Sequence, residues 1–363
     1  MAVKAGIKLL LGGSPCTHWS IAQTKNRETE PSGIGWELFK NYKIALEKFQ
    51  PDYFLYENNK SMSAAIREQI TQELGVEPIC INSALVSAQN RQRLYWTNIP
   101  GVEQPKDRGT LLRDILETGE AWRRKAYTLK AQYYKNGIAN FVTNGGYSAT
   151  GVAEPVRIGT IESEAKNADF DSQQYRVYSP DGKSVTLCGN GGGLGAKTGM
   201  YAVPQNGNAC PVYGVKDGLI TIKDKQYPIK LRDGFYIIRK LTVTECKRLQ
   251  TVPDTYVFPV SDTQAYKMLG NGWTVDVIAH ILSFAPGITE EPVEVLSMYD
   301  GMSCGHIALD KLGAQVTAYY ATEIDKYAIQ TTQTNYPETT QLGDAFQVRD
   351  ESWMAQLMEA VAV

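Results

Sequence analysis

The length, composition and charge of this chain are those of an ordinary globular protein. It has 363 residues, of which 43% are hydrophobic and 21% charged, and this balance excludes a disordered or fibrous chain. No apolar run reaches the roughly 20 residues that span a bilayer, and the first residues do not resemble a signal peptide, so a soluble cytoplasmic protein is expected. The net charge of −2 argues mildly against a nucleic-acid partner, although a cleft needs only a local positive field.

The first hundred residues alternate short apolar strands with a helical period. Residues 7–13 predict a buried strand that ends in a glycine turn, and residues 35–49 carry apolar side chains at helical spacing. Three further strands are expected, at residues 53–56, 76–82 and 93–97. Strand, helix and strand at this rhythm are typical of a parallel α/β sheet.

The composition changes between residues 101 and 236, where Gly, Tyr, Asn and Thr dominate and long helical periods are missing. A loop-rich inserted module with short strands is expected there. Helical periods return at residues 242–250 and 274–284, and Pro286 begins a linker. An α/β unit then restarts, with strands expected at 293–299, 316–322 and 339–342 and helices at 304–312, 326–335 and 352–361.

These patterns divide the chain into four segments. Residues 1–100 and 289–363 are expected to form two halves of one α/β domain. Residues 101–236 are expected to form a smaller second domain, and residues 237–288 return as helices to the first. The sheet is thus split between the two ends of the chain.

The six cysteines are scattered and include no Cys-x-x-Cys pair, so neither a zinc site nor a disulfide framework is expected, and no metal is predicted. Cys16 stands out because it follows the first predicted strand. Glu57 ends the next strand, and Arg91 and Arg93 precede Leu94. Ligands of open α/β sheets bind at the carboxyl ends of strands, so these groups are expected to converge on one crevice. A buried structural cysteine is the alternative for a lone Pro-Cys dipeptide.

A thiol, a carboxyl group and a guanidinium group suit methylation of carbon 5 of cytosine. C5 is too poor a nucleophile to attack a methyl sulfonium, but addition of a thiolate at C6 converts the ring into an enamine-like species. A protonated carboxyl group at N3 and an arginine at O2 would stabilise the charge that develops. Because these atoms are buried in a duplex, the base must be flipped out.

The chain resembles the DNA cytosine-5 methyltransferases over nearly its full length. The motifs that carry the resemblance are Ser14-Pro15-Cys16, Glu57-Asn58 with Asn59 in place of the family's Val, Gln89-x-Arg91-x-Arg93, Arg239-x-Leu241-Thr242 with Glu245 and Arg248-Leu249-Gln250, and Gly270-Asn271-Gly272. Trp273 and Thr274 stand where Val-Pro is usual. The resemblance implies double-stranded DNA as the partner, Cys16 as the nucleophile, and Glu57, Arg91 and Arg93 as the other catalytic residues.

The last α/β unit contains a glycine-bearing turn from Tyr299 to Gly305, which by itself suits a dinucleotide loop or a plain turn equally well. Glu323 ends the next predicted strand, where an acid can hold ribose hydroxyls, and Asp344 follows the third strand. The resemblance implies S-adenosylmethionine as the cofactor, with contacts from Tyr299, Gly301, Gly305, Glu323, Ile324, Asp344, Ala345, Pro15 and Asn271. Cys304 is expected to be a packing residue.

The order of these motifs differs from that of the family, which normally places the cofactor motifs first. The chain therefore resembles a circularly permuted member, with a doubly wound, mostly parallel, Rossmann-like sheet and a smaller target-recognition domain. The strand at 7–12 is expected to lie parallel and next to the strand at 293–299. Met1 and Val363 are then expected within about 25 Å of each other.

The inserted module resembles the target-recognition regions of bacterial HhaI-type methyltransferases around residues 173–178, 186–187 and 191–199. The resemblance implies that Gln173 fills the space left by the flipped base and that Arg176 reads a guanine edge. Thr186 and Gly192 are expected to contact DNA as well. The alternatives are that Arg176 only binds phosphate and that the glycines are structural.

Three other functions stay open beside DNA methylation by a prokaryotic or phage monomer. Transfer to cytosine in RNA is disfavoured by the long insert. A catalytically silent DNA-binding regulator is disfavoured because Cys16, Glu57 and both arginines are intact. A nicotinamide dehydrogenase would explain the glycine turn but not the thiol.

Overall fold

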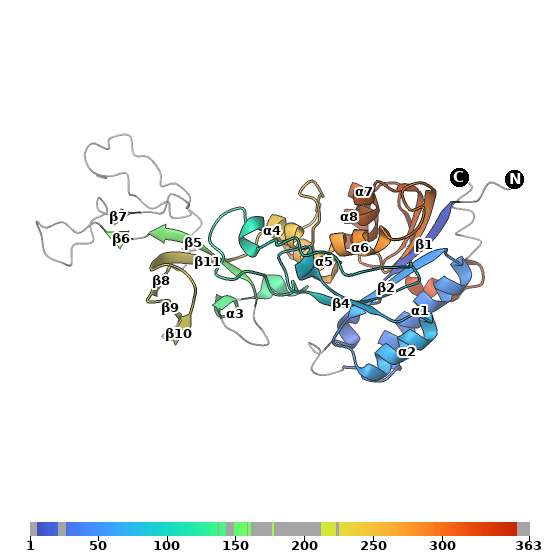
Figure 1. Cartoon of the computed structure of the whole chain (residues 1–363), viewed down its shortest axis with the longest axis horizontal. Helices are drawn as coiled ribbons and strands as arrows, with labels where there is room; N and C mark the ends of the chain where they lie inside the picture. Colours follow the sequence, from blue (N-terminus) through green and yellow to red (C-terminus); the bar gives the residue numbers. More distant parts are fainter. Residues whose placement is uncertain are drawn as a thin grey trace, which may run out of the picture.

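Two β-sheets dominate the structure, a computed structural model, and lie toward opposite ends of it (Figure 1). The structure describes residues 6–20, 27–136, 138–142, 149–157, 159–160, 176–177, 212–222 and 225–353. In these ranges no helix is long and apolar enough to cross a membrane.

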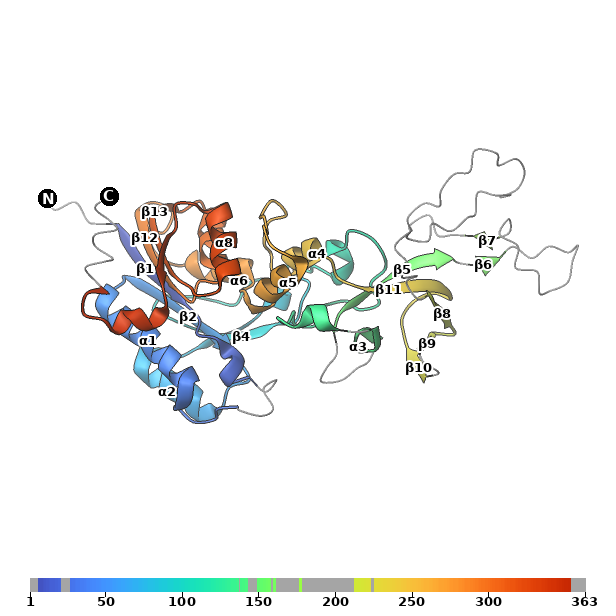
Figure 2. The ribbon, with the colours of Figure 1, turned by 180° about the vertical axis from the view of Figure 1, so that it is seen from behind.

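The larger sheet has seven strands in the order β14-β13-β12-β1-β2-β4-β3. Its strands are β1 (Ile7–Gly12), β2 (Tyr53–Asn59), β3 (Ile79–Asn82), β4 (Gln92–Thr97), β12 (Pro292–Met298), β13 (Gln315–Thr322) and β14 (Thr340–Gly343). The first strand of the chain pairs in parallel with β12 on one side and β2 on the other. The expected pairing of β1 with β12, which are far apart in the sequence, is confirmed. Figure 2 shows β1 between β12 and β2.

The direction of β4 departs from the expected parallel rhythm. It runs antiparallel to both β2 and β3. The link from Asn82 to Gln92 contains only the short 3-10 helix η2 (Ser83–Leu85), and a parallel crossover needs about a dozen residues or more. The sheet is therefore mixed but mostly parallel.

Helices cover both faces of this sheet (Figure 1). The helices α1 (Gly33–Phe49) and α2 (Ala64–Leu74) lie on one face, and α6 (Val275–Leu282), α7 (Cys304–Leu312) and α8 (Lys326–Asn335) on the other. Leu10 of β1 packs into the first layer, whereas Leu9 and Leu11 pack into the second. Side chains alternate along a strand, so a strand buried on both faces is apolar throughout, with about 1.5–3 kcal/mol from each buried leucine.

The second sheet is antiparallel, with the order β10-β9-β8-β11-β5. Its strands are β5 (Gly151–Arg157), β8 (Val212–Lys216), β9 (Leu219–Ile222), β10 (Lys225–Pro228) and β11 (Gly234–Lys240). The strand β11 runs across the expected boundary at residue 236. One cluster of buried apolar residues continues from this sheet, at Ile220 and Tyr236, to the larger one, so the domain boundaries remain predictions.

The remaining described elements connect the two sheets or flank them. They are η1 (Cys16–His18), η3 (Leu112–Ile115), η4 (Tyr133–Lys135), α3 (Ile138–Val142), β6 (Gly159–Thr160), β7 (Arg176–Val177), α4 (Val243–Leu249), α5 (Asp262–Asn271) and η6 (Ala345–Arg349). The last of these packs on α1, where Arg349 Nε donates to Asn41 Oδ1 at 2.6 Å. Beyond Trp353 the expected final helix, and with it the expected distance between Met1 and Val363, lies outside the described residues.

Candidate active site

The loop that leads from β1 to Cys16 is held by two polar side chains of β2. Asn58 Nδ2 donates to the backbone oxygen of Ser14 at 3.2 Å, and the hydroxyls of Ser14 and Tyr56 are 2.7 Å apart. All three residues are buried, and a buried polar group without a partner is costly, so these contacts fix the loop. Cys16 begins η1 directly after this loop, while its side chain lies outside the described part of the structure.

Glu57 lies beside this loop and is bound by side chains of two other elements. Arg93 Nε lies 3.0 Å from Glu57 Oε1, and the indole Nε1 of Trp273 donates to Glu57 Oε2 at 3.0 Å. The Glu57 side chain is only 11% exposed. A Cβ atom on Gly13 would stand 3.2 Å from Glu57 Oε2, so the backbone passes close to the carboxyl group and leaves little room for a side chain there. The predicted convergence of acid, arginine and nucleophile loop is therefore supported by contacts.

Arg91 lies two residues before Arg93, but its guanidinium group binds backbone oxygens instead of a carboxyl group. Its guanidinium group donates to the carbonyls of Leu129 at 3.0 Å, Gly270 at 3.3 Å and Gly272 at 2.9 Å. The side chain is buried, and a planar guanidinium can bind several acceptors at once. Arg91 thus joins β4 to the turn between α5 and α6.

Gln89 and Gln250 extend this buried polar network. Gln89 Nε2 donates to Gln250 Oε1 at 2.8 Å, and Gln250 Nε2 donates to the carbonyl of Leu269 at 2.6 Å. The hydroxyl of Thr274 donates to Gln250 Oε1 at 2.9 Å. A Cβ on Gly270 would overlap the backbone at Ala131, which explains why this position needs glycine. These residues hold the α5–α6 turn in place.

The Arg-x-Leu-Thr motif forms the entry to α4. Thr242 and Glu245 form a reciprocal capping box, and Arg239 donates to both carboxylate oxygens of Glu245, at 2.8 and 2.9 Å. Glu245 is fully buried, and a buried carboxylate without its cation is strongly destabilising, so Glu245 needs Arg239 as its partner. The motif therefore has a structural role where β11 meets the helices.

The predicted cofactor turn follows β12 and has an unusual backbone. Tyr299, Gly301 and Ser303 have positive φ angles of 61°, 61° and 56°. Asp300 lies among them and accepts from the hydroxyls of Ser303 and, at 2.8 Å, Tyr319. Burial raises the pKa of Asp300 to about 6, against the opposing effect of these hydrogen bonds. A strained turn with a neutralisable acid is typical of a functional site.

Glu323 closes this turn through backbone donors. Its Oε2 accepts from the N–H of Gly301 at 2.8 Å, and its Oε1 accepts from the N–H groups of Ile324 at 2.7 Å and Asp325 at 2.8 Å. The side chain of Ile324 is 73% exposed beside it. An acid next to an exposed apolar side chain fits a ligand with hydroxyls and a flat ring.

The other predicted cofactor residues surround the same edge of the sheet. Asp344 is the N-cap of η6 and accepts from the N–H of Phe346 at 2.9 Å, and Ala345, the first residue of η6, is buried. A Cβ on Gly305 would stand 2.5 Å from Leu11, so α7 approaches β1 closely. The remaining two predicted contacts, Pro15 and Asn271, are exposed.

Cys304 is buried at the start of α7, and burial raises the pKa of its thiol to about 12. It stays protonated near neutral pH, as expected of a packing residue. Among the described residues no group of three or more His, Cys, Asp and Glu could hold a metal ion.

The predicted DNA contacts all belong to the inserted module, residues 101–236. Gln173, Thr186 and Gly192 lie outside the described residues. Arg176 is described only in its backbone, which pairs with Thr160 between β7 and β6.

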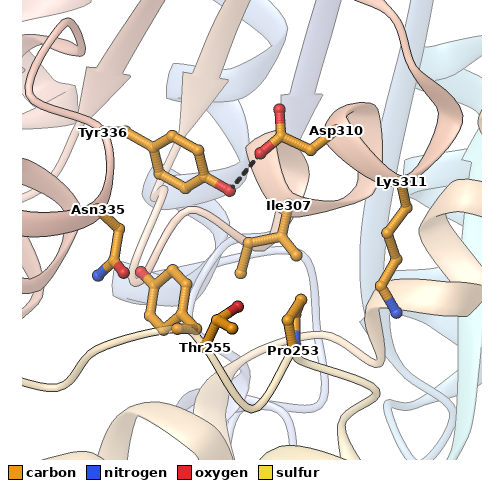
Figure 3. Close-up of a pocket in the computed structure, with 8 residues that line it drawn as sticks. Pro253, Thr255, Ile307, Asp310, Lys311, Asn335 and Tyr336 are labelled. Atoms are coloured by element: carbon orange, nitrogen blue, oxygen red, sulfur yellow. Dashed lines mark hydrogen bonds between the residues drawn. The ribbon is translucent and has the colours of Figure 1, made fainter.

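A surface pocket of about 330 Å³ lies between α7, the end of α8 and residues 253–256 (Figure 3). The hydroxyl of Tyr336 donates to Asp310 at 2.7 Å across it. The end of α8 leads into the amino end of β14, so this pocket lies away from the carboxyl ends where the predicted site is.

Trp273 contacts the site although the sequence does not predict a role for it. In the sequence it is only a departure from the usual Val-Pro, yet its indole N–H donates to Glu57. Its place next to the Gly-Asn motif is the one signal that pointed to it.

The comparison with protein families gives a match over most of the chain. The model described as C-5 cytosine-specific DNA methylase matches residues 2–284. The Type II methyltransferase M.HpaII of Haemophilus parainfluenzae is 26% identical over 290 residues, covering 74% of this chain and 69% of that protein. M.HhaI of Haemophilus parahaemolyticus, also a Type II methyltransferase, is 25% identical over 291 residues, covering 75% and 74%.

Solved structures give weaker matches. The methyltransferase EhMeth of Entamoeba histolytica aligns with a TM-score of 0.40 at 10% identity, covering 76% of each chain. A mutant of Spodoptera frugiperda DNMT2 aligns with a TM-score of 0.41 at 16% identity, covering 76% of this chain and 78% of that chain.

Proposed function

This chain belongs to the C-5 cytosine-specific DNA methylase family, and from that premise we propose how its own residues transfer a methyl group to cytosine. It is a DNA cytosine C5 methyltransferase similar to bacterial Type II methyltransferases. The observation that carries the assignment of residues is the contact of Glu57 with Arg93, directly beneath the loop that leads to Cys16.

We assign the covalent chemistry to Cys16, Glu57 and Arg93. The Cys16 thiolate adds to C6 of the flipped cytosine, which makes C5 nucleophilic. Glu57 holds a proton at N3, and Arg93 stabilises the charge that develops at O2. After C5 has gained the methyl group, loss of the C5 proton and of the thiolate restores the ring. Arg91 acts as a positioning residue, because its guanidinium group binds three backbone oxygens.

We assign the methyl donor, S-adenosylmethionine, to the turn after β12. The donor set fits this group: Glu323 is held at the edge of the sheet for the ribose hydroxyls, and exposed Ile324 offers an apolar surface to the adenine. Tyr299, Gly301, Gly305, Asp344 and Ala345, with Pro15 and Asn271, complete the proposed contacts. When bound, the donor supplies an electrophilic methyl group on a sulfonium.

A suicide substrate tests the nucleophile. DNA that carries 5-fluorocytosine should form a stable covalent adduct with the protein, because the C5 fluorine cannot leave as a proton does. We expect Cys16→Ala to form no adduct and to transfer no methyl group, while Cys80→Ala, a change in a cysteine of β3, keeps both. An adduct with Cys16→Ala would refute the assignment of the nucleophile. Preferential methylation of tRNA over DNA would show that RNA is the substrate instead.

We also infer that the motif order is circularly permuted. The inference is supported by β1, which pairs with both β12 and β2, and by the family match, which ends before the turn after β12 and the two acids that follow it. A rearranged chain with residues 289–363 ahead of residues 1–288 should then fold and methylate DNA. A rearranged chain that folds but does not bind S-adenosylmethionine would contradict this.

The target-recognition role of residues 101–236 is proposed on the motif resemblance. There Gln173, Thr186 and Gly192 are assigned to DNA contacts, and Arg176 to a guanine edge. With Arg176→Ala, discrimination at one base pair should fall by about 1–3 kcal/mol in a methylation assay on variant sites. A uniform loss over all sequences would make Arg176 a phosphate contact instead.

A further inference from the structure

Trp273 occupies the short link between two helices of the active site. The helix α5 ends at Asn271 with Gly272 as its C-cap, and α6 begins at Val275 with Thr274 as its N-cap. Trp273 is thus the one residue between the two cap residues, and its backbone has little conformational freedom.

Buried polar groups fix the backbone on both sides of this tryptophan. The carbonyl of Gly272 accepts from Arg91 at 2.9 Å and from Gln250 at 3.3 Å. On the other side, the hydroxyl of Thr274 donates to Gln250 and accepts from Ser83, each at 2.9 Å. A functional side chain is held most accurately when its own backbone is locked in this way.

The indole of Trp273 reaches the acid of the proposed reaction. Its Nε1 donates to Glu57 Oε2 at 3.0 Å and lies 3.3 Å from the position that a Cβ on Gly13 would take. Its backbone oxygen lies 3.8 Å from the sulfur of Cys304, the first residue of the helix that follows the cofactor turn. Trp273 thus contacts the acid and the helix that follows the cofactor turn, and it lies beside the loop that leads to Cys16.

One hydrogen-bond donor does not fix the orientation of a glutamate carboxyl group, because the energy profile of its terminal torsion is broad and roughly two-fold. Arg93 binds Oε1 and leaves rotation about that contact open. A second donor on Oε2, from a different element, defines the plane of the carboxyl group. Each oxygen keeps another lone-pair position, so the group can still share a proton with a base.

We propose that Trp273 is a positioning residue for Glu57, and that its indole N–H aligns the carboxyl group with the target cytosine. The proposal rests on the assignment of Glu57 made above. It gives a specific function to the residue that departs from the usual Val-Pro, and it predicts that the N–H group itself, rather than the ring, is needed.

The first test is Trp273→Phe, which keeps an aromatic ring and removes the donor. We expect the single-turnover rate of methyl transfer to fall about tenfold to a hundredfold, since a hydrogen bond to an ionisable group is lost and the acid is misplaced. Adduct formation with 5-fluorocytosine DNA should slow by a similar factor. The dissociation constants of DNA and S-adenosylmethionine should change less than about twofold, because the contact acts on the reaction step.

A matched control is Trp96→Phe in β4. The indole of Trp96 donates to the hydroxyl of Thr71 at 3.0 Å, so this change also removes an indole hydrogen bond, from a buried tryptophan that does not contact Glu57. This change should lower the melting temperature and leave the transfer rate within about twofold of the wild type. Equal losses of rate in the two variants would overturn the proposal.

A second variant separates the donor from the shape of the ring. Benzothienylalanine at position 273 keeps the bicyclic outline and replaces the N–H group by sulfur, so it avoids a failure to fold. It should be as slow as Trp273→Phe, and a wild-type rate would overturn the proposal. A loss confined to DNA or cofactor affinity in either variant would also overturn it. The proposed function fails separately, if the wild-type protein forms no adduct and methylates no cytosine.

Discussion

The two acids of the predicted active site are held in different ways. Glu57 is bound by side chains of other elements, Arg93 and Trp273, which lie far from it in the sequence. Glu323 is bound by backbone N–H groups, two of which belong to the residues that follow it directly. A side chain held by backbone donors depends on one local turn, whereas one held by other side chains depends on the whole packing around it. The catalytic half of the site should therefore be the more sensitive to distant substitutions.

Replacing the acid of the catalytic half should have the largest effect. In Glu57→Gln the carboxyl group can no longer exchange a proton with the base, and general acid–base groups contribute about a hundredfold to ten thousandfold. The transfer rate at saturating DNA should fall by this factor, while the dissociation constant of S-adenosylmethionine stays unchanged in calorimetry. A variant that loses cofactor affinity instead would show that the two halves are not independent.

The two arginines should separate stability from catalysis. Arg91→Ala leaves buried carbonyl oxygens without their donor and should lower the free energy of unfolding by about 3 kcal/mol. Arg93→Ala should cost about 1 kcal/mol, since Glu57 keeps Trp273 as a donor, but it should strongly reduce the transfer rate. Urea titration and rate measurement on both variants check this. If Arg93→Ala were strongly destabilised and Arg91→Ala were as stable as the wild type, the roles proposed for the two arginines would be reversed.

The acid of the cofactor half should show the opposite pattern to Glu57. Glu323→Gln places an amide N–H₂ group against backbone donors, and the dissociation constant of S-adenosylmethionine should rise about tenfold or more. The transfer rate at saturating cofactor should be nearly that of the wild type. An unchanged dissociation constant would remove Glu323 from the cofactor site.

The smallest expected effect is a pH dependence caused by Asp300. The pKa of this acid is raised to about 6 in the folded protein, above its ordinary value of 3.8, so the folded state binds more protons between these values. Stability must therefore fall as pH rises through this window. Relative to Asp300→Asn, the wild type should lose about 1 kcal/mol between pH 5 and pH 7. Melting curves of both proteins over this range measure the difference, and parallel curves would contradict it.

The elements with a clear period were predictable from the sequence. The patterns at 304–312 and 326–335 predict α7 and α8 with the bounds observed. The sequence pattern does not predict α2, because this helix is mostly polar and buries only Ile66, Ile70 and Leu74, and it does not predict α5 either. The sheet is mostly parallel, as expected, but the antiparallel direction of β4 was not predictable from its own residues, because the short link before it decides the direction.

The site was predictable in which residues it uses, but not in how the arginine reaches the acid. Arg93 lies 3.0 Å from Glu57 because β4 runs antiparallel to β2 and begins beside the end of that strand. The contact of Trp273 was not predictable, since it depends on how the α5–α6 turn packs across the sheet. Similarly, the sequence spacing of Arg91 does not reveal that backbone oxygens are its partners.

The central place of β1 has a consequence for how the protein forms during synthesis. Ile7 pairs with Val293, so β1 is synthesised well before its partner strand, which follows about 290 residues later. Until then one edge of this apolar strand stays unpaired, and such edges invite association between nascent chains. Contacts of this sequence separation also slow folding. We therefore expect the newly made chain to depend on chaperones until β12 has emerged, whatever the stability of the finished molecule.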